Sequence, residues 1–467
     1  MSKDKKKNDE GYTPRKAVAY STGQIADQAA YQAFTVLVFT FYFSIAKIPI
    51  ILITFGFVIW SFWNSFNDPM LGWLSDRTHT KYGRRLPFIM ISLIPLGIMM
   101  ILLFTPPVSI GITDITMNFI YFMIMIILFE FWYTMYSLNA TSLFPETFIT
   151  AEERIAANNI RQSLLVIGLA LGIILPGLII SDYSDPASLP EYQMFGVILA
   201  ILIIVIGFIF IKFTPREKAE FSEDYKSTPP IKESITICVQ NKSFMWYIPT
   251  EIANWFVYTM LATMVPLYGK FVLGADATQT ALLLATAFLS AVLFITILWK
   301  PVVRKIGTKK AWMISMSIWI VTLVPLMFIQ DVIGGIIVFF FVGAGLAGSL
   351  YIVDLIVSDI IDEDELNTGM RREAGYYGVN AFFLRLSSVL VFLAIGPLFI
   401  IADWEVFDPN NITPQIIFTL RALMCILPII ALSIGIIAIS QYPLHGERLK
   451  KVKEDLKRIH EEKKSKV

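Results

Sequence analysis

The chain has 467 residues, of which 56% are hydrophobic and only 16% are charged, and its formal net charge is +1. A mean hydropathy of +0.65 excludes an ordinary soluble domain, since no such domain needs this much apolar surface. Apolar runs such as "VILAILIIVIGFIFI" can cross a hydrocarbon core of about 30 Å as helices of roughly 20 residues. Two cysteines and three histidines are too few for a disulfide framework or a His-based metal site.

Twelve apolar windows are the predicted membrane-spanning helices of an all-α membrane protein. In chain order they cover residues 18–46, 49–74, 87–105, 115–145, 157–181, 192–213, 243–271, 277–300, 311–330, 332–360, 375–402 and 416–441. Lys and Arg are concentrated in alternate loops, and the opposite loops, such as "SDYSDPASLPEYQ", have none. The positive-inside rule therefore predicts that both termini are cytoplasmic, and the polar, basic N-terminus is not expected to be a cleavable signal peptide.

A polar linker at 214–242 separates the first six predicted helices from the last six. The expected organisation is a cytoplasmic tail at 1–17, six-helix bundles at 18–213 and 243–443, and a second cytoplasmic tail at 444–467 that is solvated and partly helical. The loops "SDRTHTKYGRR" and "VVRKIGTKK" follow the second span of each half and share a Gly followed by basic residues. This favours two parallel repeats, which in transporters enclose a site near the membrane midplane; the alternative is two ordinary cytoplasmic loops.

Polar residues inside the second span are the first candidate functional residues, because a charge at a helix centre costs a few kcal/mol. Asn64, Asn67 and Asp68 lie within about one helical turn. An acid with two carboxamide oxygens makes an oxygen-rich cage for Na⁺, and a lone acid could carry a proton instead. On the alternative interpretation Asp68 is a helix-end residue paired with a loop Arg, which leaves both Asn residues unexplained.

The other spans hold further polar residues that face a cavity or a partner on the same argument. They are Gln24, Asp27, Gln28 and Tyr31 in the first span, Glu130, Thr134, Ser137 and Thr141 in the fourth, Arg161 in the fifth, and Glu251, Asn254, Trp255, Tyr258, Tyr351, Asp354, Asn380 and Arg385 in the second half. Glu130 could instead be buried and neutral, and the two Arg residues could be structural counter-ions. Aromatic residues such as Trp60 are interpreted as packing residues or interface anchors.

Three stretches resemble signatures of one transporter family. "NDPMLGWLSDRTHTKYGRRLPF" is similar to the segment after helix two of the glycoside–pentoside–hexuronide:cation symporters, the melibiose-permease family within the major facilitator superfamily. "SDIIDEDELNTGMRREAGYYGVNAFFLRL" resembles the family's loop between helices ten and eleven, and "SLFPETFITAEERIAANNIRQ" its helix-four exit. The resemblance extends over nearly the whole chain and implies the twelve-helix major facilitator fold.

The resemblance implies a cation site that contains Asp68, Asn67 and the helix-four Thr134. Asn64 stands where sodium-coupled melibiose carriers have a second Asp, so one negative charge of the family's site is missing. Glu130 lies one turn from Thr134, at a position that is usually small in those carriers. We therefore interpret Glu130 as the replacement carboxylate, with Na⁺ or H⁺ as the coupling ion.

The solute site implied by the resemblance departs further from the family pattern. Arg161 matches the helix-five Arg, and Arg385 falls where melibiose carriers have a helix-eleven Lys. The two Asp residues that hold the sugar correspond to Gln28 and Ser137, and the stacking Trp to Thr141. Asp27, Tyr351 and Asp354 complete the predicted solute-binding set. Two Arg residues with fewer acids favour a hexuronide, another acidic glycoside or a lysophospholipid-like anion over melibiose.

Charged residues in two cytoplasmic loops are the predicted gate, because they resemble elements that latch the two halves of major facilitators. They are Asp76, Arg77, Gly83, Arg84 and Arg85 in the first half, and Asp362, Arg371 and Arg372 in the second. The alternative for the basic residues is simple positive-inside topology.

The resemblance implies a cation-coupled secondary transporter of the cell membrane that works by alternating access, with the solute bound between the halves. A sugar, glycoside or hexuronide is the expected solute, and the chain is expected to be a monomer that binds no nucleic acid. A Na⁺- or H⁺-coupled carrier of an anionic lipid or organic acid is the alternative within transporters. A membrane sensor that has lost transport is the alternative outside them. An enzyme is not expected, since no His, Cys or acid pair has the setting of a catalytic site.

Overall fold

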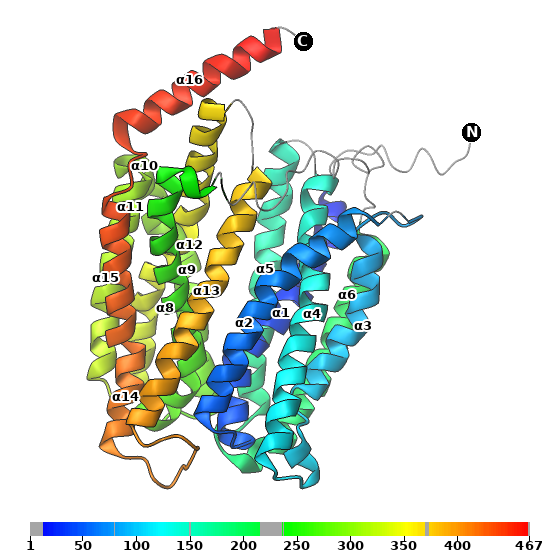
Figure 1. Ribbon diagram of the computed structural model, residues 1–467, viewed down its shortest axis with the longest axis vertical. Coiled ribbons are helices and arrows are strands. Elements are labelled where there is room, and N and C mark those ends of the chain that lie inside the picture. The colour runs from blue at the N-terminus through cyan, green and yellow to red at the C-terminus, as the bar shows by residue number, and fades with distance from the viewer. Residues whose placement is uncertain are drawn as a thin grey trace. The chain divides into compact units, whose positions relative to one another are not determined.

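The computed structural model describes residues 13–78, 80–148, 151–214, 236, 238–368 and 373–465, and every regular element within these ranges is helical (Figure 1). Ten of the described helices are long and apolar enough to cross a membrane. The third predicted span is an apolar helix that is shorter, at Leu86–Leu102. The first, Pro14–Thr40, has 27 residues but is not among the ten. The all-α prediction is confirmed, and the count of twelve spans stays a prediction.

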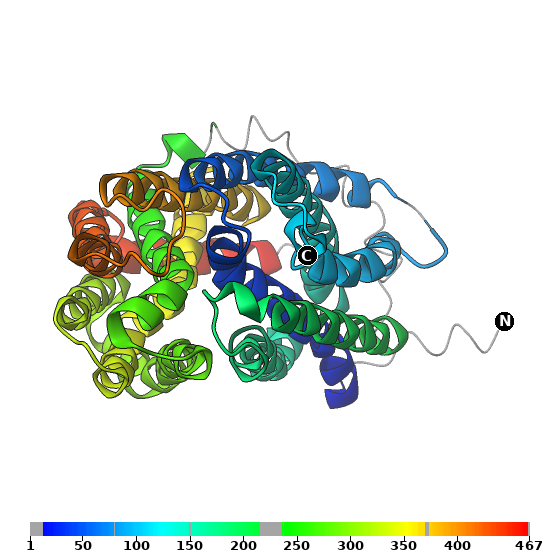
Figure 2. The same cartoon turned by 90° about the horizontal axis from the view of Figure 1, so that it is seen from below.

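The chain divides into two compact units, each a bundle of helices that are seen nearly end-on in Figure 2. Unit 1 comprises residues 1–228, 276–281 and 399–412, and unit 2 comprises the remaining residues, 229–275, 282–398 and 413–467. The helices of unit 1 are α1 (Pro14–Thr40), α2 (Ile50–Asp76), α3 (Leu86–Leu102), α4 (Ile115–Thr147), α5 (Ala151–Ile179) and α6 (Leu189–Phe213).

Helix α1 is the central helix of unit 1 and packs against α4, α5 and α6. Its contact with α5 is close because α5 presents glycines there. A Cβ added at Gly168 would lie 2.8 Å from the Gln28 Cβ, and one added at Gly172 would lie 2.6 Å from the Gln32 Cβ. Small residues that let backbones approach are a common basis of helix packing in membranes, where burying apolar surface gives no driving force. This contact positions the polar face of α1 beside α5.

The helices of unit 2 are α8 (Lys242–Leu273), α9 (Ala277–Phe294), α10 (Lys300–Ile306), α11 (Thr308–Leu323), α12 (Val332–Thr368), α13 (Glu373–Ile401), α14 (Pro414–Met424), α15 (Ile426–Ser440) and α16 (Gly446–Ser465). The first residues of α9 and the last of α13 belong to unit 1. Local signals set the ends of α8. Asn241 caps its first turn by accepting a hydrogen bond from the Phe244 N–H at 3.1 Å, and Gly274 ends it with φ 65°.

Helix α12 packs against α8 and α11, and glycines again allow the close approach. A Cβ added at Gly345 would lie 2.3 Å from the Trp319 Cβ, and one added at Gly348 would lie 2.1 Å from the Ser315 Oγ. The Trp319 indole, which belongs to α11, is therefore pressed directly against the α12 backbone. A larger residue at Gly345 would displace that ring.

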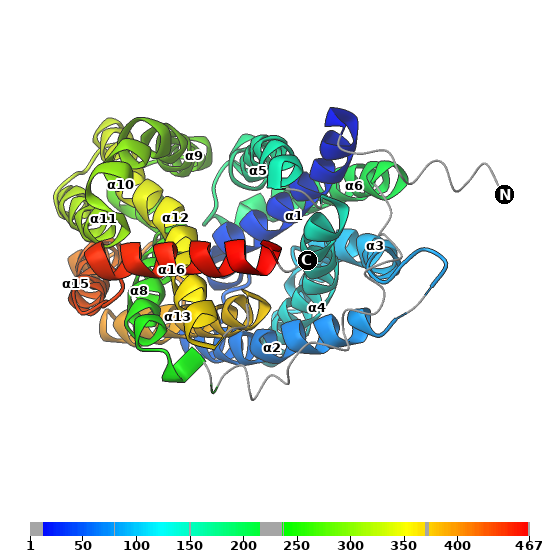
Figure 3. The same cartoon turned by 90° about the horizontal axis from the view of Figure 1, so that it is seen from above.

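The C-terminal tail is a helix whose described residues are mostly exposed, as the sequence predicts, and one face of it docks on unit 2. Helix α16 passes across the end of α12 (Figure 3), and its Val452 and Leu456 are 7% and 5% exposed. Arg448 Nη2 lies 2.6 Å from Glu363 Oε1, and Lys453 Nζ lies 2.7 Å from Asp359 Oδ1. This docking was not predicted from the sequence; it depends on an i, i+4 apolar pair and two basic residues that share one face of α16.

We expect Leu456→Ser to loosen α16, because burying a Leu side chain contributes about 1.5–3 kcal/mol. Amide hydrogen exchange of residues 446–465 in the purified protein should become roughly tenfold faster or more. Lys457→Ser, at the exposed next position, is the matched control and should leave the exchange unchanged. Equal exchange in wild type and Leu456→Ser would show that this face does not hold the helix.

Candidate functional site

The polar residues of the second and fourth predicted spans meet where α2 packs against α4. A small apolar core of Leu71, Phe88 and Met135 holds these helices together beside the polar residues. The Thr134 Oγ1 lies 3.2 Å from Asp68 Oδ1 and 3.2 Å from Glu130 Oε1. A hydroxyl has one hydrogen, so Thr134 can donate to only one of the two carboxylates at a time. We call Asn64, Asn67, Asp68, Glu130 and Thr134 the α2–α4 cluster.

Trp60 belongs to the same site, although the sequence interpretation assigned it to packing. Its Nε1 donates to Glu130 Oε2 at 3.1 Å, and Phe34 and Phe57 hold its ring at centroid distances of 5.4 and 5.9 Å. The spacing could have identified it, since Trp60 lies one turn before Asn64 on the same face of α2. Trp60 fixes one Glu130 oxygen with a neutral donor and leaves the carboxylate charge in place.

The two Asn side chains of the cluster are buried with unused hydrogen-bonding groups. Asn64 and Asn67 are both 0% exposed. The Asn67 Nδ2 donates to the Glu130 backbone oxygen at 3.1 Å, but its Oδ1 has no hydrogen-bond partner within the described ranges, and neither do the Oδ1 and Nδ2 of Asn64. A buried polar atom without a partner costs about 1–3 kcal/mol. Unpaired carboxamide oxygens beside two carboxylates fit a small desolvated cation, for which oxygen is the preferred ligand.

A second polar group forms between α1, α4 and α5. The Gln28 Nε2 donates to Asp27 Oδ2 at 3.1 Å, and Asp27 is 5% exposed. The electrostatic surroundings of Asp27 include the hydroxyl of Ser137 and the guanidinium of Arg161. The contacts of α1 with α5 and with α4 bring these four predicted solute-binding residues together, and the Arg161 Cζ also lies 5.2 Å from the Phe144 ring centroid. Thr141, one turn beyond Ser137, is exposed.

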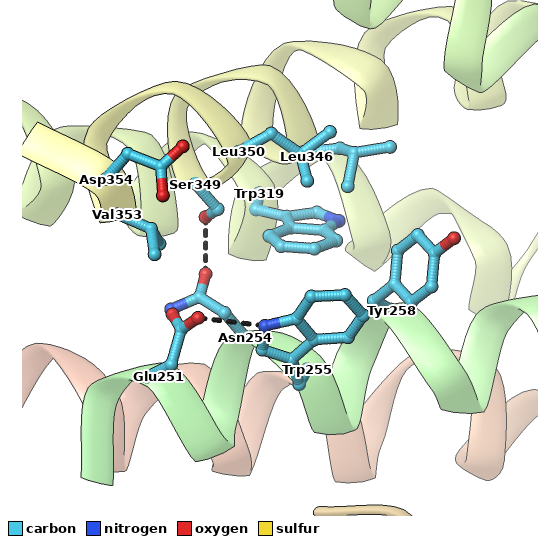
Figure 4. A pocket seen from close by; sticks show the side chains of 10 residues that line it. All are labelled: Glu251, Asn254, Trp255, Tyr258, Trp319, Leu346, Ser349, Leu350, Val353 and Asp354. Atoms are coloured by element: carbon cyan, nitrogen blue, oxygen red, sulfur yellow. Dashed lines mark hydrogen bonds between the residues drawn. The ribbon is translucent and has the colours of Figure 1, made fainter. Parts of the chain in front are cut away.

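The predicted solute-binding residues of unit 2 lie on two helices, α12 and α13. Asp354 is exposed and lines a cavity of about 190 Å³ between α8, α11 and α12. Tyr351 is half-buried and is not among the described residues that line this cavity. Arg385 is half-buried on α13. Most residues that line this cavity were not among the predicted site residues, although four of the lining residues share one face of the seventh predicted span. The described lining is Glu251, Asn254, Trp255, Tyr258, Trp319, Leu346, Ser349, Leu350, Val353 and Asp354 (Figure 4).

The predicted gate residues of the first half surround the end of α2, which ends at Asp76. Arg84 and Arg85 are 4% and 8% exposed, and the Arg85 Nη1 donates to Ser75 Oγ at 2.6 Å. Gly83 allows the tight turn before them with φ 99°. Topology alone would leave both Arg side chains in solvent, so their burial favours a structural or gating role.

The other gate residues are placed less completely. The Arg77 Cζ lies 4.3 Å from the Trp73 ring centroid, and Asp362 is half-buried on α12. Arg371 and Arg372 lie outside the described residues. Gating itself remains a prediction for all eight residues.

The chain resembles proteins of known sequence and structure. A model of the MFS/sugar transport protein family matches residues 19–446. The sodium-dependent lysophosphatidylcholine symporter 1 of Mus musculus is 23% identical, with 86% of this chain and 80% of that protein covered. The isoprimeverose transporter of Lactiplantibacillus pentosus is 22% identical, over 76% and 73% of the two chains. A putative glycoside/cation symporter of Escherichia coli (strain K12) is 22% identical, over 95% of both.

Among solved structures, that of a D-xylose-proton symporter superposes with a TM-score of 0.64 at 12% sequence identity. The superposition covers 90% of this chain and 96% of that one. At this identity the likeness concerns the fold, which is that of the major facilitator superfamily.

In sodium-free buffer we expect Asn64→Leu to be as stable as wild type, or more stable by about 1–2 kcal/mol. The reason is that a buried amide without partners is replaced by an apolar group of similar size. The measurement is the unfolding temperature in detergent. Asn118→Leu is the contrast, because the amide of the buried Asn118 makes hydrogen bonds to Val108, Ile112 and Asp114. That change should lose about 3 kcal/mol. Equal losses in both variants would mean that the Asn64 amide is hydrogen-bonded.

Proposed function

The chain belongs to the family of MFS/sugar transport proteins, and we propose that it is a cation-coupled symporter whose solute is a sugar, glycoside or hexuronide. The observation that carries this proposal is the α2–α4 cluster, where two carboxylates and unpaired carboxamide oxygens lie together inside a bundle of transmembrane helices. The names of the relatives support it, since they include a glycoside/cation symporter and an isoprimeverose transporter. As a member of a transport family it moves a solute and is not an enzyme.

The coupling cation is proposed to bind Asn64, Asn67 and Asp68, with Thr134 and Glu130 completing the site. Asp68 supplies one negative charge and Glu130 a second, in place of the acid that Asn64 lacks. Two carboxylates close together in a low-dielectric environment repel each other, and a bound cation removes that repulsion. Trp60 contributes by holding the Glu130 side chain against α2.

The solute is proposed to be bound in unit 1 by Asp27, Gln28, Ser137, Thr141 and Arg161. The Arg161 guanidinium supplies donors for a carboxylate or hydroxyls, and Asp27 supplies an acceptor. In unit 2 the proposed solute-binding residues are Tyr351, Asp354 and Arg385. If the cation and the solute favour the same conformation, each strengthens the binding of the other by the same factor. In the proposed protein of twelve spans with cytoplasmic termini, alternating access would then couple the movement of the solute to that of the cation.

An anionic lipid is the second candidate solute. The resemblance to the lysophosphatidylcholine symporter of the mouse supports it, because that protein is sodium-dependent and matches most of this chain. Arg161 would pair with the phosphate, since a guanidinium binds such groups through two parallel hydrogen bonds.

We expect Asp68→Asn to reduce gradient-driven solute accumulation at least tenfold, because the cluster loses a charge that a cation requires. Purified protein in liposomes would be tested with isoprimeverose, D-xylose, D-glucuronate and lysophosphatidylcholine, under an inward sodium or proton gradient. Asp114→Asn is the control, since it removes an acid at the start of α4 while Asn still caps the helix. Accumulation by Asp68→Asn equal to wild type would place the coupling site elsewhere.

Glu130→Gln tests the replacement carboxylate in the same liposomes. We expect the variant to lose the response to the coupling gradient while it still equilibrates the solute, because the second charge of the cluster is gone. An ion dependence equal to wild type would exclude Glu130 from coupling. A wild-type protein that moves none of the solutes under either gradient would instead favour the sensor.

A further inference from the structure

The two halves of the chain carry matching residues at one constant separation of 224 positions (251 − 27 = 224). The matched pairs are Asp27 and Glu251, Tyr31 and Trp255, Gly83 and Gly307, Glu130 and Asp354, and Arg161 and Arg385. The same shift relates α1 to α8 and α4 to α12. Helix α1 contacts α4 within unit 1, and α8 contacts α12 within unit 2. Unit 2 therefore repeats the acids and the Arg of unit 1 on equivalent helices.

The matched acids of unit 2 both line the cavity between α8, α11 and α12. Figure 4 shows Glu251 at one end of the space and Asp354 at the rim formed by α12. In the same view the indole rings of Trp255 and Trp319 lie on opposite sides of the space, and Tyr258 closes the other end. The cavity thus has acids at one end, aromatic rings from α8 and α11, and the aliphatic side chains of Leu346, Leu350 and Val353 from α12.

Glu251 is a fixed acceptor with one oxygen unused. The side chain is 1% exposed, and the Trp255 Nε1 donates to its Oε1 at 2.8 Å. Its Oε2 is buried and has no hydrogen-bond partner among the described residues. An unpaired buried carboxylate oxygen is expensive, so a group that donates a hydrogen bond to it would bind favourably.

A donor without a partner lies in the same lining. The Trp319 Nε1 is buried and has no hydrogen-bond acceptor within the described ranges. The ring cannot easily turn away, because Gly345 brings the α12 backbone against it. The neighbouring Asn254 is already satisfied, since its Oδ1 accepts from Ser349 and its Nδ2 donates to the Thr250 backbone oxygen. Glu251 Oε2 and the Trp319 N–H are therefore two buried polar atoms in the wall of the cavity that no described residue satisfies.

The charge of the described lining disfavours an anion. Of the ten described residues that form it, two are acids and none is Lys or Arg. Acids and aromatic rings would also attract a quaternary ammonium group. Such a group has no N–H or O–H, so it can satisfy neither Glu251 Oε2 nor the Trp319 N–H. A hydroxyl both donates and accepts, and the apolar face of a sugar ring fits between two indoles.

We propose that this cavity is a subsite for a neutral sugar ring, in which Glu251 accepts a hydroxyl and Trp255 and Trp319 cover the faces of the ring. Trp255 is also a positioning residue, because its indole N–H holds the Glu251 carboxylate. The inference rests on the proposed transport of a sugar or glycoside and adds where in unit 2 a ring is held. An acidic group of the solute would then be recognised outside this subsite.

The test is binding of D-xylose, D-glucose, D-galactose and their methyl glycosides to the purified full-length protein, measured by calorimetry. We expect Glu251→Gln to weaken sugar binding about tenfold or more, since an acceptor oxygen of the carboxyl group is replaced by an NH₂ group, which can only donate. Trp255→Phe should weaken it as well, because the ring face remains but the carboxylate is no longer held. Trp246→Phe, at an exposed position of the same helix, should bind as wild type does.

A second measurement separates this inference from the proposed function. Stabilisation of the protein by sodium or protons depends on the α2–α4 cluster, so it should be unchanged in Glu251→Gln and absent in Asp68→Asn. The wild-type protein could show no stabilisation by ions while its sugar binding still depends on Glu251. That result would overturn symport and support the subsite.

Three results would overturn the subsite. One is sugar binding that is equal in wild type, Glu251→Gln and Trp255→Phe. Another is a wild type to which no sugar of the panel binds. The third is that choline chloride binds and the sugars do not, and that the same variants weaken the binding of choline. This result would assign the cavity to a quaternary ammonium group. If Glu251→Gln elutes as aggregate, Trp319→Phe replaces it, with the same expected loss.

Discussion

The Thr134 hydroxyl has one hydrogen and stands 3.2 Å from carboxylate oxygens of two residues, Asp68 and Glu130. Because it can donate to only one of them, the other is left without that bond inside a helix bundle. Glu130 is 0% exposed and Asp68 is half-buried, and two nearby carboxylates raise each other's energy when both are ionised. The α2–α4 contact therefore places the unfavourable charge of unit 1 where an additional positive charge would relieve it.

The two units bury a glutamate in the same way. Glu130 receives a hydrogen bond from the Trp60 indole, and Glu251 receives one from the Trp255 indole. An indole N–H is a neutral donor, so it orients the carboxyl group without supplying a positive charge. The surroundings then differ. Glu130 lies beside amides, a hydroxyl and a second acid, which suits a cation, whereas Glu251 lies beside aromatic rings, which suits the face of an organic ring. This division agrees with a family whose members transport sugars.

Hydropathy and local signals in the sequence predicted most helix ends to within a few residues, but α5 begins six residues earlier and α12 ends eight residues later than predicted. The ends of α8 follow from Asn241 and Gly274, whose preferences for caps are intrinsic. The pattern of Asn64, Asn67 and Asp68 predicted a cluster, because residues one turn apart must share a helix face. Its partners on α4 came from the family resemblance, and the docking of α16 was missed because the tail carries many charges.

The sequence by itself determined which segments are transmembrane helices and which of their faces are polar, since both depend only on hydrophobicity and the helical repeat. The tertiary structure alone decided that Trp60 bonds Glu130 and that the Asn64 amide has no partner in the described structure. It also decided that Trp319 joins Glu251 and Trp255 around one cavity. These contacts join helices far apart in the chain. Their register depends on where Gly168 and Gly345 let backbones approach, and no local propensity encodes that.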